Sequence, residues 1–219
     1  MPFNIPIFLT WLRVALIPLV VGVYYLPASW LPQADRDLSA TIVFIVAAIT
    51  DWFDGYLARR WNQTSAFGAF LDPVADKLIV AVALVLLVSK DMPPIIVPGF
   101  ETLDGGQATL RAASVRVILV LSAIIIIGRE IAISALREWM AEIGQRGKVK
   151  VSSMGKLKTI LQIVGLSCML FRWNLPILPG FSLPIFEIGL VLTIVAAVLT
   201  LMSAISYLRA AWPDLKGHA

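Results

Sequence analysis

Charge is scarce in this sequence. Charged residues make up 15% of its 219 residues, against roughly a quarter in a typical soluble domain. Hydrophobic residues make up 59%, and the mean hydropathy is +0.86. An internal core cannot absorb this apolar excess, so it must face lipid, which excludes an ordinary soluble domain. The chain is therefore expected to be an integral membrane protein.

Cysteine and histidine occur once each. Cys168 has no partner for an intramolecular disulfide, and it is interpreted as a small buried side chain in an apolar run. His218 lies in a polar tail and is interpreted as a solvated residue. We find no internal repeat, low-complexity tract or linker to a soluble domain, so a single membrane domain is expected over residues 1–219.

Six apolar runs are long enough to cross a bilayer, which requires about 20 helical residues. They lie near residues 7–27, 39–60, 69–89, 116–140, 153–172 and 184–208. We expect the first to be a retained helix rather than a secretory signal, because no basic region precedes it, its apolar stretch is long and Arg13 lies inside it. The sequence thus predicts an all-α membrane protein with six transmembrane helices.

Basic residues are shared unevenly between the two sets of connecting segments, and this asymmetry fixes orientation during insertion. One side carries Arg59, Arg60, Arg137, Arg146, Lys148, Lys150, Lys156, Lys158, Arg209 and Lys216. The other carries Arg36, Lys90, Arg111, Arg116 and Arg172. The richer side should be cytoplasmic together with both termini, and the long stretch near residues 90–115 should be external.

Seven small or acidic residues form two stripes in the second and third predicted helices. At about 100° per residue, Asp51, Asp54, Gly55 and Ala58 share one narrow face. In the next helix a stripe recurs every fourth residue, at Gly68, Asp72 and Asp76. The turn between these antiparallel helices centres near residue 64. The four carboxylates should therefore meet at one depth, in a polar cavity open to the cytoplasmic side.

Four carboxylates this close require positive charge, because ionised groups in a low-dielectric setting are costly and repel one another. Aspartate oxygens are hard ligands, and no histidine or cysteine lies nearby, which favours Mg²⁺ or Mn²⁺ over zinc. Two divalent cations would neutralise the four acids. The alternative is an ion-paired helix hairpin balanced by Arg59, Arg60 and Lys77, in which Gly55 and Ala58 serve close helix packing.

The complete pattern from Asp51 to Asp76 is D-x-x-D-G-x-x-A-R-x8-G-x3-D-x3-D. It resembles the signature of the CDP-alcohol phosphotransferases, membrane enzymes that often form homodimers. The resemblance implies that two divalent metals clamp the diphosphate of a CDP-linked lipid. It further implies the following roles: Asp51, Asp54, Asp72 and Asp76 as metal ligands, Gly55, Ala58 and Gly68 as room for the nucleotide, Arg59 as a phosphate contact, and Asp76 as general base.

A phosphorylated acceptor would need fixed cations, and the fourth and fifth predicted helices offer Arg129, Arg137, Lys156 and Lys158. Pairing of Arg129 with Glu130 is an alternative, but these neighbours should point about 100° apart, which favours an anion pocket. For the neighbouring Lys148 and Lys150 the alternative is an ordinary cytoplasmic basic loop that holds anionic lipid.

The stretches around these cations and the amino-terminal "NIPIFLTWLR" resemble the bacterial phosphatidylglycerophosphate synthases, a branch of the family. The resemblance covers most of residues 3–89 and 124–165. It implies CDP-diacylglycerol and glycerol 3-phosphate as substrates, membrane lipids as further partners, no nucleic acid, and a place in the bacterial cytoplasmic membrane. The alternatives are another acceptor such as serine or inositol phosphate, an intramembrane prenyltransferase, and a divalent-cation transporter.

Overall fold

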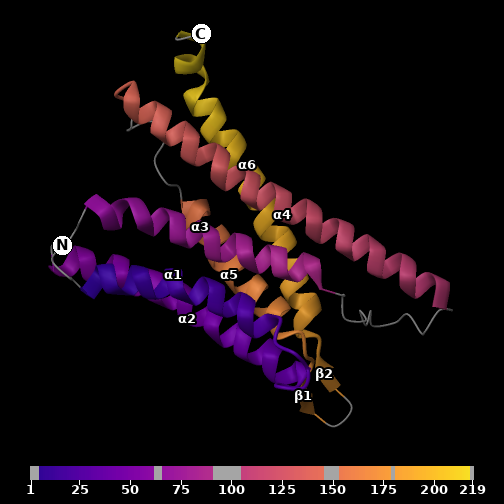
Figure 1. Ribbon diagram of the computed structural model, residues 1–219. Coiled ribbons are helices and arrows are strands. Elements are labelled where there is room, and N and C mark those ends of the chain that lie inside the picture. Colours follow the sequence, from indigo (N-terminus) through magenta and orange to yellow (C-terminus); the bar gives the residue numbers. More distant parts are fainter. Residues whose placement is uncertain (1–4, 62–65, 91–104, 146–152, 179–180, 218–219) are drawn as a thin grey trace. The chain divides into compact units, whose positions relative to one another are not determined.

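A computed structural model describes residues 5–61, 66–90, 105–145, 153–178 and 181–217, although some side chains within these ranges are not described. Over this part of the chain there are six helices and one short hairpin (Figure 1). The elements are α1 Ile5–Tyr24, α2 Gln33–Trp61, α3 Ala66–Ser89, α4 Gly105–Glu142, α5 Ser153–Phe171, β1 Leu175–Leu178, β2 Phe181–Leu183 and α6 Ile185–Gly217.

Each predicted apolar run overlaps one of these helices, so the prediction of six helices is confirmed. The largest differences from the apolar runs are at three ends: α2 begins at Gln33 rather than near 39, α4 begins at Gly105 rather than near 116, and α6 ends at Gly217 rather than near 208. The added turns are rich in polar residues. Such residues can form a helix, but a search for apolar runs does not detect them. The hairpin was not part of the all-α prediction, because strands of four and three residues are too short to show an alternating pattern.

Among the described residues, two helical segments are long and apolar enough to cross a membrane, Ser114–Glu142 and Ile185–Asp214. Phe8–Tyr24 and Leu157–Phe171 are shorter apolar helices. Most side chains of the two long segments face outward, including Leu121, Ile124 and Met202, which are about half exposed or more. Exposed apolar side chains in such number suit lipid rather than water. Six membrane spans and their orientation stay predictions.

The chain divides into two compact units, which we call unit 1 and unit 2. Unit 1 is Met1–Pro98 with Leu166–Gly189, and unit 2 is Gly99–Gly165 with Leu190–Ala219. Helices α5 and α6 each contribute residues to both units. The expectation of a single domain therefore stays a prediction.

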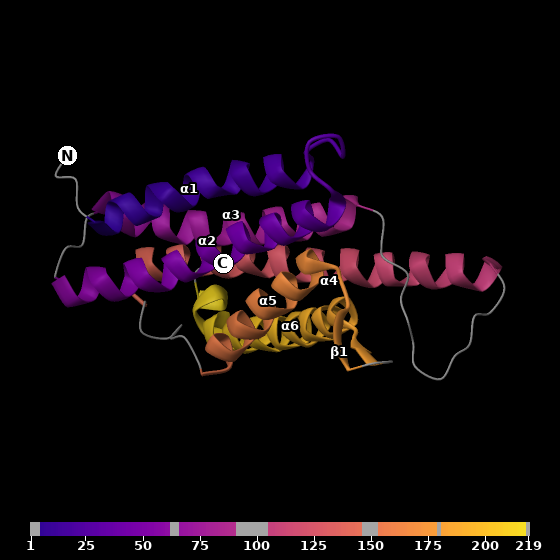
Figure 2. The ribbon, with the colours of Figure 1, turned by 90° about the horizontal axis from the view of Figure 1, so that it is seen from below.

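In unit 1, helix α1 packs against α2 and α3 (Figures 1 and 2). The contact face of α2 includes Ala40, Phe44 and Ala47, all fully buried at helical spacing. On α3 the buried side chains recur every fourth residue, at Ala75, Ile79, Ala83 and Leu87. Alanines on these faces let the helix backbones approach closely, which suits helix association in a membrane.

In unit 2, α4 packs against α6 through a small apolar core formed by Ile133, Leu136, Met140, Tyr207 and Ala211. Helix α4 then ends in a Schellman turn. Gly144 has a positive φ of 75°, and its N–H donates to the carbonyl of Ala141, while the N–H of Gln145 donates to that of Met140. Glycine tolerates this left-handed conformation without a steric penalty, so the helix has a defined end.

Candidate active site

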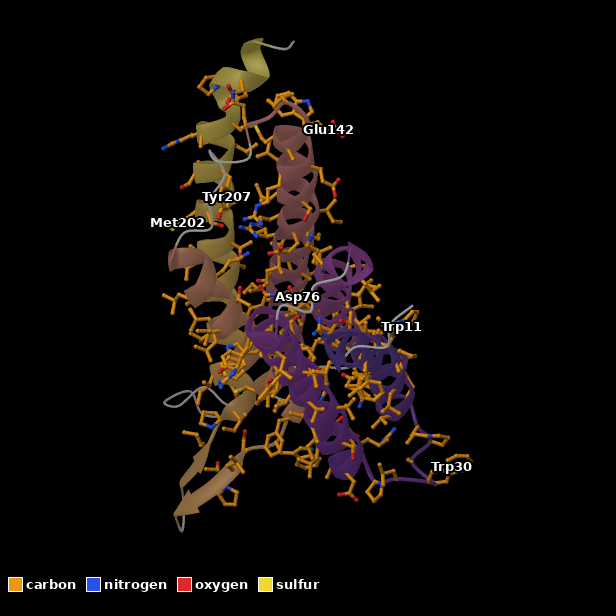
Figure 3. All side chains as sticks on the ribbon, turned by 90° about the vertical axis from the view of Figure 1, so that its left-hand side faces the viewer. Trp11, Trp30, Asp76, Glu142, Met202 and Tyr207 are labelled. Atoms are coloured by element: carbon orange, nitrogen blue, oxygen red, sulfur yellow. The ribbon has the colours of Figure 1, made fainter. Side chains whose placement is uncertain are left out.

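The aspartate motif lies across α2 and α3 of unit 1. Asp51 and Asp76 have described side chains, and Asp76 is labelled in Figure 3. The other predicted donor-site residues have helical backbones, but their side chains lie outside the described part: Asp54, Gly55, Ala58, Arg59, Gly68 and Asp72. The side chains that are described include two of the four aspartates, and no three metal-binding groups gather among them. The four-carboxylate cluster stays a prediction.

Asp51 is paired with an arginine from a different helix. Nη1 of Arg13, on α1, lies 2.7 Å from Oδ1 of Asp51. The side chain of Arg13 is fully buried, whereas that of Asp51 is 40% exposed. Sequence reasoning noted Arg13 inside an apolar helix but did not assign it to the site. The sequence feature that could have pointed to Arg13 is that it is the only charged residue in α1.

Arg60 was one of three cations proposed to balance the aspartates in the alternative reading. In the structure its Nη1 donates to the Tyr56 hydroxyl at 2.7 Å, and its guanidinium lies 5.9 Å from the centre of the Tyr56 ring. Tyr56 in turn stacks on Trp52, with ring centroids 6.0 Å apart. The described contacts of Arg60 thus extend an exposed aromatic row along α2.

A second charged cluster lies in unit 2, around Glu130 of α4. Its Oε1 accepts from Nη1 of Arg129 at 2.7 Å and from Nζ of Lys158 at 2.6 Å. The side chains of Arg129 and Lys158 are only 8% and 6% exposed. The expectation that Arg129 and Glu130 point apart was wrong, because their long side chains span the 100° that separates their Cβ atoms. This pairing does not exclude an anion pocket, because one acid is shared by two cations.

Helix α6 contributes polar groups to this cluster. Nη2 of Arg129 donates to Oγ of Ser203 at 3.2 Å, and Nη2 of Arg137 lies 3.5 Å from the Tyr207 hydroxyl. The guanidinium carbons of Arg129 and Arg137 lie 5.6 and 5.4 Å from the centre of the Tyr207 ring. Figure 3 labels Tyr207 on α6.

Of the predicted acceptor cations, the structure therefore brings Arg129, Arg137 and Lys158 to one place, and the side chain of Lys156 lies outside the described part. Sequence reasoning missed Ser203 and Tyr207. Their spacing of four residues in an apolar helix was the available signal. Among the described side chains of this cluster, three cations lie around one carboxylate, and this excess of positive charge suits an anion such as a phosphate.

A further ion cluster in unit 1 is distant from the motif, roughly 21 Å along α2 at about 1.5 Å per residue. The side chain of Asp37 is 1% exposed; its Oδ1 lies 3.0 Å from Nζ of Lys90, and its Oδ2 lies 3.8 Å from Nε of Arg172. Nζ of Lys90 also lies 4.2 Å from the centre of the Tyr24 ring. Arg172 follows α5 directly and has a φ of 63°, a left-handed conformation that is uncommon for arginine. This cluster joins the ends of helices.

Comparison with known proteins places the chain in a family. The CDP-alcohol phosphatidyltransferase family matches residues 3–202. The chain belongs to this family. Its match extends beyond the two regions that sequence reasoning identified, through residues 90–123 and most of α6.

Two relatives of this CDP-alcohol phosphatidyltransferase carry the same name, CDP-diacylglycerol–glycerol-3-phosphate 3-phosphatidyltransferase. They come from Shigella flexneri serotype 5b (strain 8401) and Escherichia coli (strain K12). Each is 48% identical to the chain over 215 residues, which cover 98% of this chain and 98% of the relative. The predicted resemblance to the family is confirmed.

The donor set of the motif fits a divalent metal. The partly exposed Asp51 offers a hard carboxylate oxygen, as Mg²⁺ and Mn²⁺ prefer. Oδ1 of Asp51 lies against Arg13, and the side chain is 40% exposed, so solvent can reach this carboxylate.

Proposed function

We propose that this protein transfers the phosphatidyl group of CDP-diacylglycerol to a hydroxyl of glycerol 3-phosphate, giving phosphatidylglycerol phosphate and CMP. The observation that carries the proposal is the 48% identity to phosphatidyltransferases of this name over 98% of the chain. The complete aspartate motif agrees with it. The reaction takes place at the cytoplasmic membrane of a bacterium, in a homodimer whose protomers each cross the membrane six times with both termini in the cytoplasm.

The donor binds to unit 1. Asp51, Asp54, Asp72 and Asp76 hold two divalent cations, Mg²⁺ or Mn²⁺. When bound, these cations neutralise charge on the diphosphate and on the departing CMP. The small residues Gly55, Ala58 and Gly68 make room for the nucleotide against the helices, and Arg59 contacts its phosphates.

Asp76 is the general base. Its carboxylate takes the proton of the acceptor hydroxyl as the hydroxyl oxygen attacks the β-phosphorus. The bond between that phosphorus and the oxygen of CMP breaks on the opposite side, so the phosphatidyl group moves to the acceptor. A carboxylate serves as base here because nearby cations favour formation of the attacking alkoxide.

The acceptor's phosphate binds to the basic cluster of unit 2, which contains Arg129, Arg137, Lys156 and Lys158. Arg129 and Lys158 are buried and share Glu130, so they are held in place before the acceptor arrives. The Tyr207 ring supports both guanidinium groups through cation–π contacts. An acceptor without a phosphate, such as serine, would leave this positive charge uncompensated.

The test is CMP release by the purified full-length protein in lipid nanodiscs containing CDP-diacylglycerol. Release should require both a divalent cation and glycerol 3-phosphate, and it should stop in EDTA and resume with excess Mg²⁺ or Mn²⁺. Serine and inositol phosphate, added in competition, should not replace glycerol 3-phosphate. Faster release with either of them would reassign the acceptor. Divalent-cation flux into liposomes without any CMP release would indicate a transporter instead.

A further inference from the structure

Arg13 occupies a position where an arginine is costly. It lies near the middle of α1 and is the only charged residue of that helix. Its side chain is fully buried. A buried guanidinium in an apolar helix costs several kcal/mol unless an anion compensates it, so its partner defines its role.

One partner is Asp51, the first aspartate of the motif, whose Oδ1 lies 2.7 Å from Nη1 of Arg13. The guanidinium is enclosed and the carboxylate is 40% exposed, so Arg13 lies on the buried side of a carboxylate that solvent can still reach. An arginine ion-paired with one oxygen of a carboxylate restricts the side-chain rotamer of the acid and so influences the direction of its second oxygen. Groups that orient a metal ligand in this way typically change metal affinity by about 10- to 100-fold when they are removed.

We propose that Arg13 is a positioning residue of the donor site, which holds Asp51 in the orientation needed for a metal ligand. The inference rests on the proposed function, because it requires Asp51 to bind the metal. It also supplies a charge. Two divalent cations would only balance the four aspartates, and the cation from α1 makes the occupied site positive toward a diphosphate.

Two substitutions of Arg13 distinguish a role in orienting Asp51 from a role in only linking α1 to α2. Arg13→Lys keeps the charge but loses the planar, forked guanidinium, whereas Arg13→Met keeps most of the apolar stem and loses the charge. The matched controls are Arg36→Lys and Arg36→Met. Arg36 belongs to the same unit and donates to the backbone carbonyl of Leu26, away from the motif.

The measurement is Mn²⁺ binding to full-length protein in nanodiscs, followed through the electron paramagnetic resonance signal of free Mn²⁺, with no substrate present. We expect Arg13→Lys to weaken binding by about tenfold. Arg13→Met should weaken it further, and the Arg36 variants should bind as the wild type does. The thermal unfolding midpoint in EDTA checks that each variant is folded, and Arg13→Lys carries the test if Arg13→Met does not fold.

The Asp51→Asn background gives a second, independent readout. If Arg13 acts through Asp51, adding Arg13→Lys to Asp51→Asn should weaken Mn²⁺ binding no further. An additive loss would contradict the proposal. Wild-type Mn²⁺ affinity in both Arg13 variants would also contradict it, because the pair would then only link α1 and α2. Tighter Mn²⁺ binding in the variants would contradict it as well, because the guanidinium would then compete with the metal.

The two proposals fail in different ways. A wild-type protein that neither binds Mn²⁺ nor releases CMP rejects the proposed function, and the role of Arg13 with it. A wild-type protein that does both, with Arg13 variants that bind Mn²⁺ normally, rejects only the role of Arg13.

Discussion

The two predicted substrate regions distribute their charges in opposite ways. In unit 1 the described pair joins one buried arginine to one partly exposed carboxylate, so the acid is the group with an open side. In unit 2 one carboxylate is shared by two nearly buried cations, and Arg137 lies nearby, so positive charge is in excess. The first arrangement suits a cation and the second an anion. In each region, the sign of the more exposed or more numerous charge among the described side chains agrees with the charge of the predicted ligand.

The largest effect is expected at Asp76, the aspartate of the motif that is proposed as the general base. Asp76→Asn removes the proton acceptor with little change in shape, so turnover should fall by roughly 10²- to 10⁴-fold while CDP-diacylglycerol still binds. CMP release and equilibrium donor binding measure the two effects. Asp35→Asn, which changes an exposed acid in the first turn of α2, is the control. A turnover number equal to that of the wild type would refute the role of Asp76 as base.

The next largest effect is expected in the basic region. Arg129→Ala should raise the KM for glycerol 3-phosphate by about 10- to 100-fold, because a charged hydrogen bond contributes roughly 1.5–3 kcal/mol. In the same variant, the KM for CDP-diacylglycerol should change by less than about threefold. Arg209→Ala, at an exposed position on α6, is the matched control. An equal loss for both substrates would remove the acceptor-pocket assignment.

Substitution of Asp37 tests whether a buried ion cluster that is distant from the motif affects stability rather than metal binding. Asp37→Asn leaves Lys90 and Arg172 without their carboxylate, so the free energy of unfolding should fall by about 2 kcal/mol. The Mn²⁺ dependence of the folded enzyme should not change. Thermal unfolding and a Mn²⁺ titration measure these two quantities. A shifted Mn²⁺ midpoint would mean that this distant cluster is coupled to the motif.

The smallest effect is expected at Tyr207. Tyr207→Phe removes the hydroxyl that lies 3.5 Å from Arg137 but retains the ring beneath both guanidinium groups. A bond of that length is weak, so the KM for glycerol 3-phosphate should rise by only about two- to threefold. Tyr207→Ala, which also removes the ring, should have a larger effect. If Tyr207→Phe were as damaging as Arg129→Ala, the hydroxyl rather than the ring would be the important group.

The sequence predicted the helices better than the contacts between them. Apolar runs located all six helices, because a run of membrane length is a strong signal. They missed the polar first turns of α4, since hydropathy marks apolar stretches and not the ends of helices. The two-stranded hairpin was missed because its strands are too short to show a period.

In the candidate site, too, the positions of residues along the helices were predicted better than their contacts. Spacing alone placed Asp51 and Asp76 on α2 and α3, and it selected Arg129, Arg137 and Lys158, which the structure brings together. Helical angles failed for Arg129 and Glu130, because such angles describe Cβ directions and not the reach of long side chains. Partners from distant segments, such as Arg13 for Asp51 and Tyr207 for the arginines, depend on tertiary packing that no local pattern encodes.

The pair of Arg13 and Asp51 also bears on how the protein enters its membrane. An arginine at the centre of a helix makes insertion of that helix less favourable by about 3 kcal/mol. Helix α1 is synthesised before α2 and would carry this penalty alone until α2 arrives with Asp51. In the predicted six-span arrangement the two helices would therefore be most stable in lipid as a pair, and the first aspartate of the motif would contribute to assembly as well as to the proposed metal site.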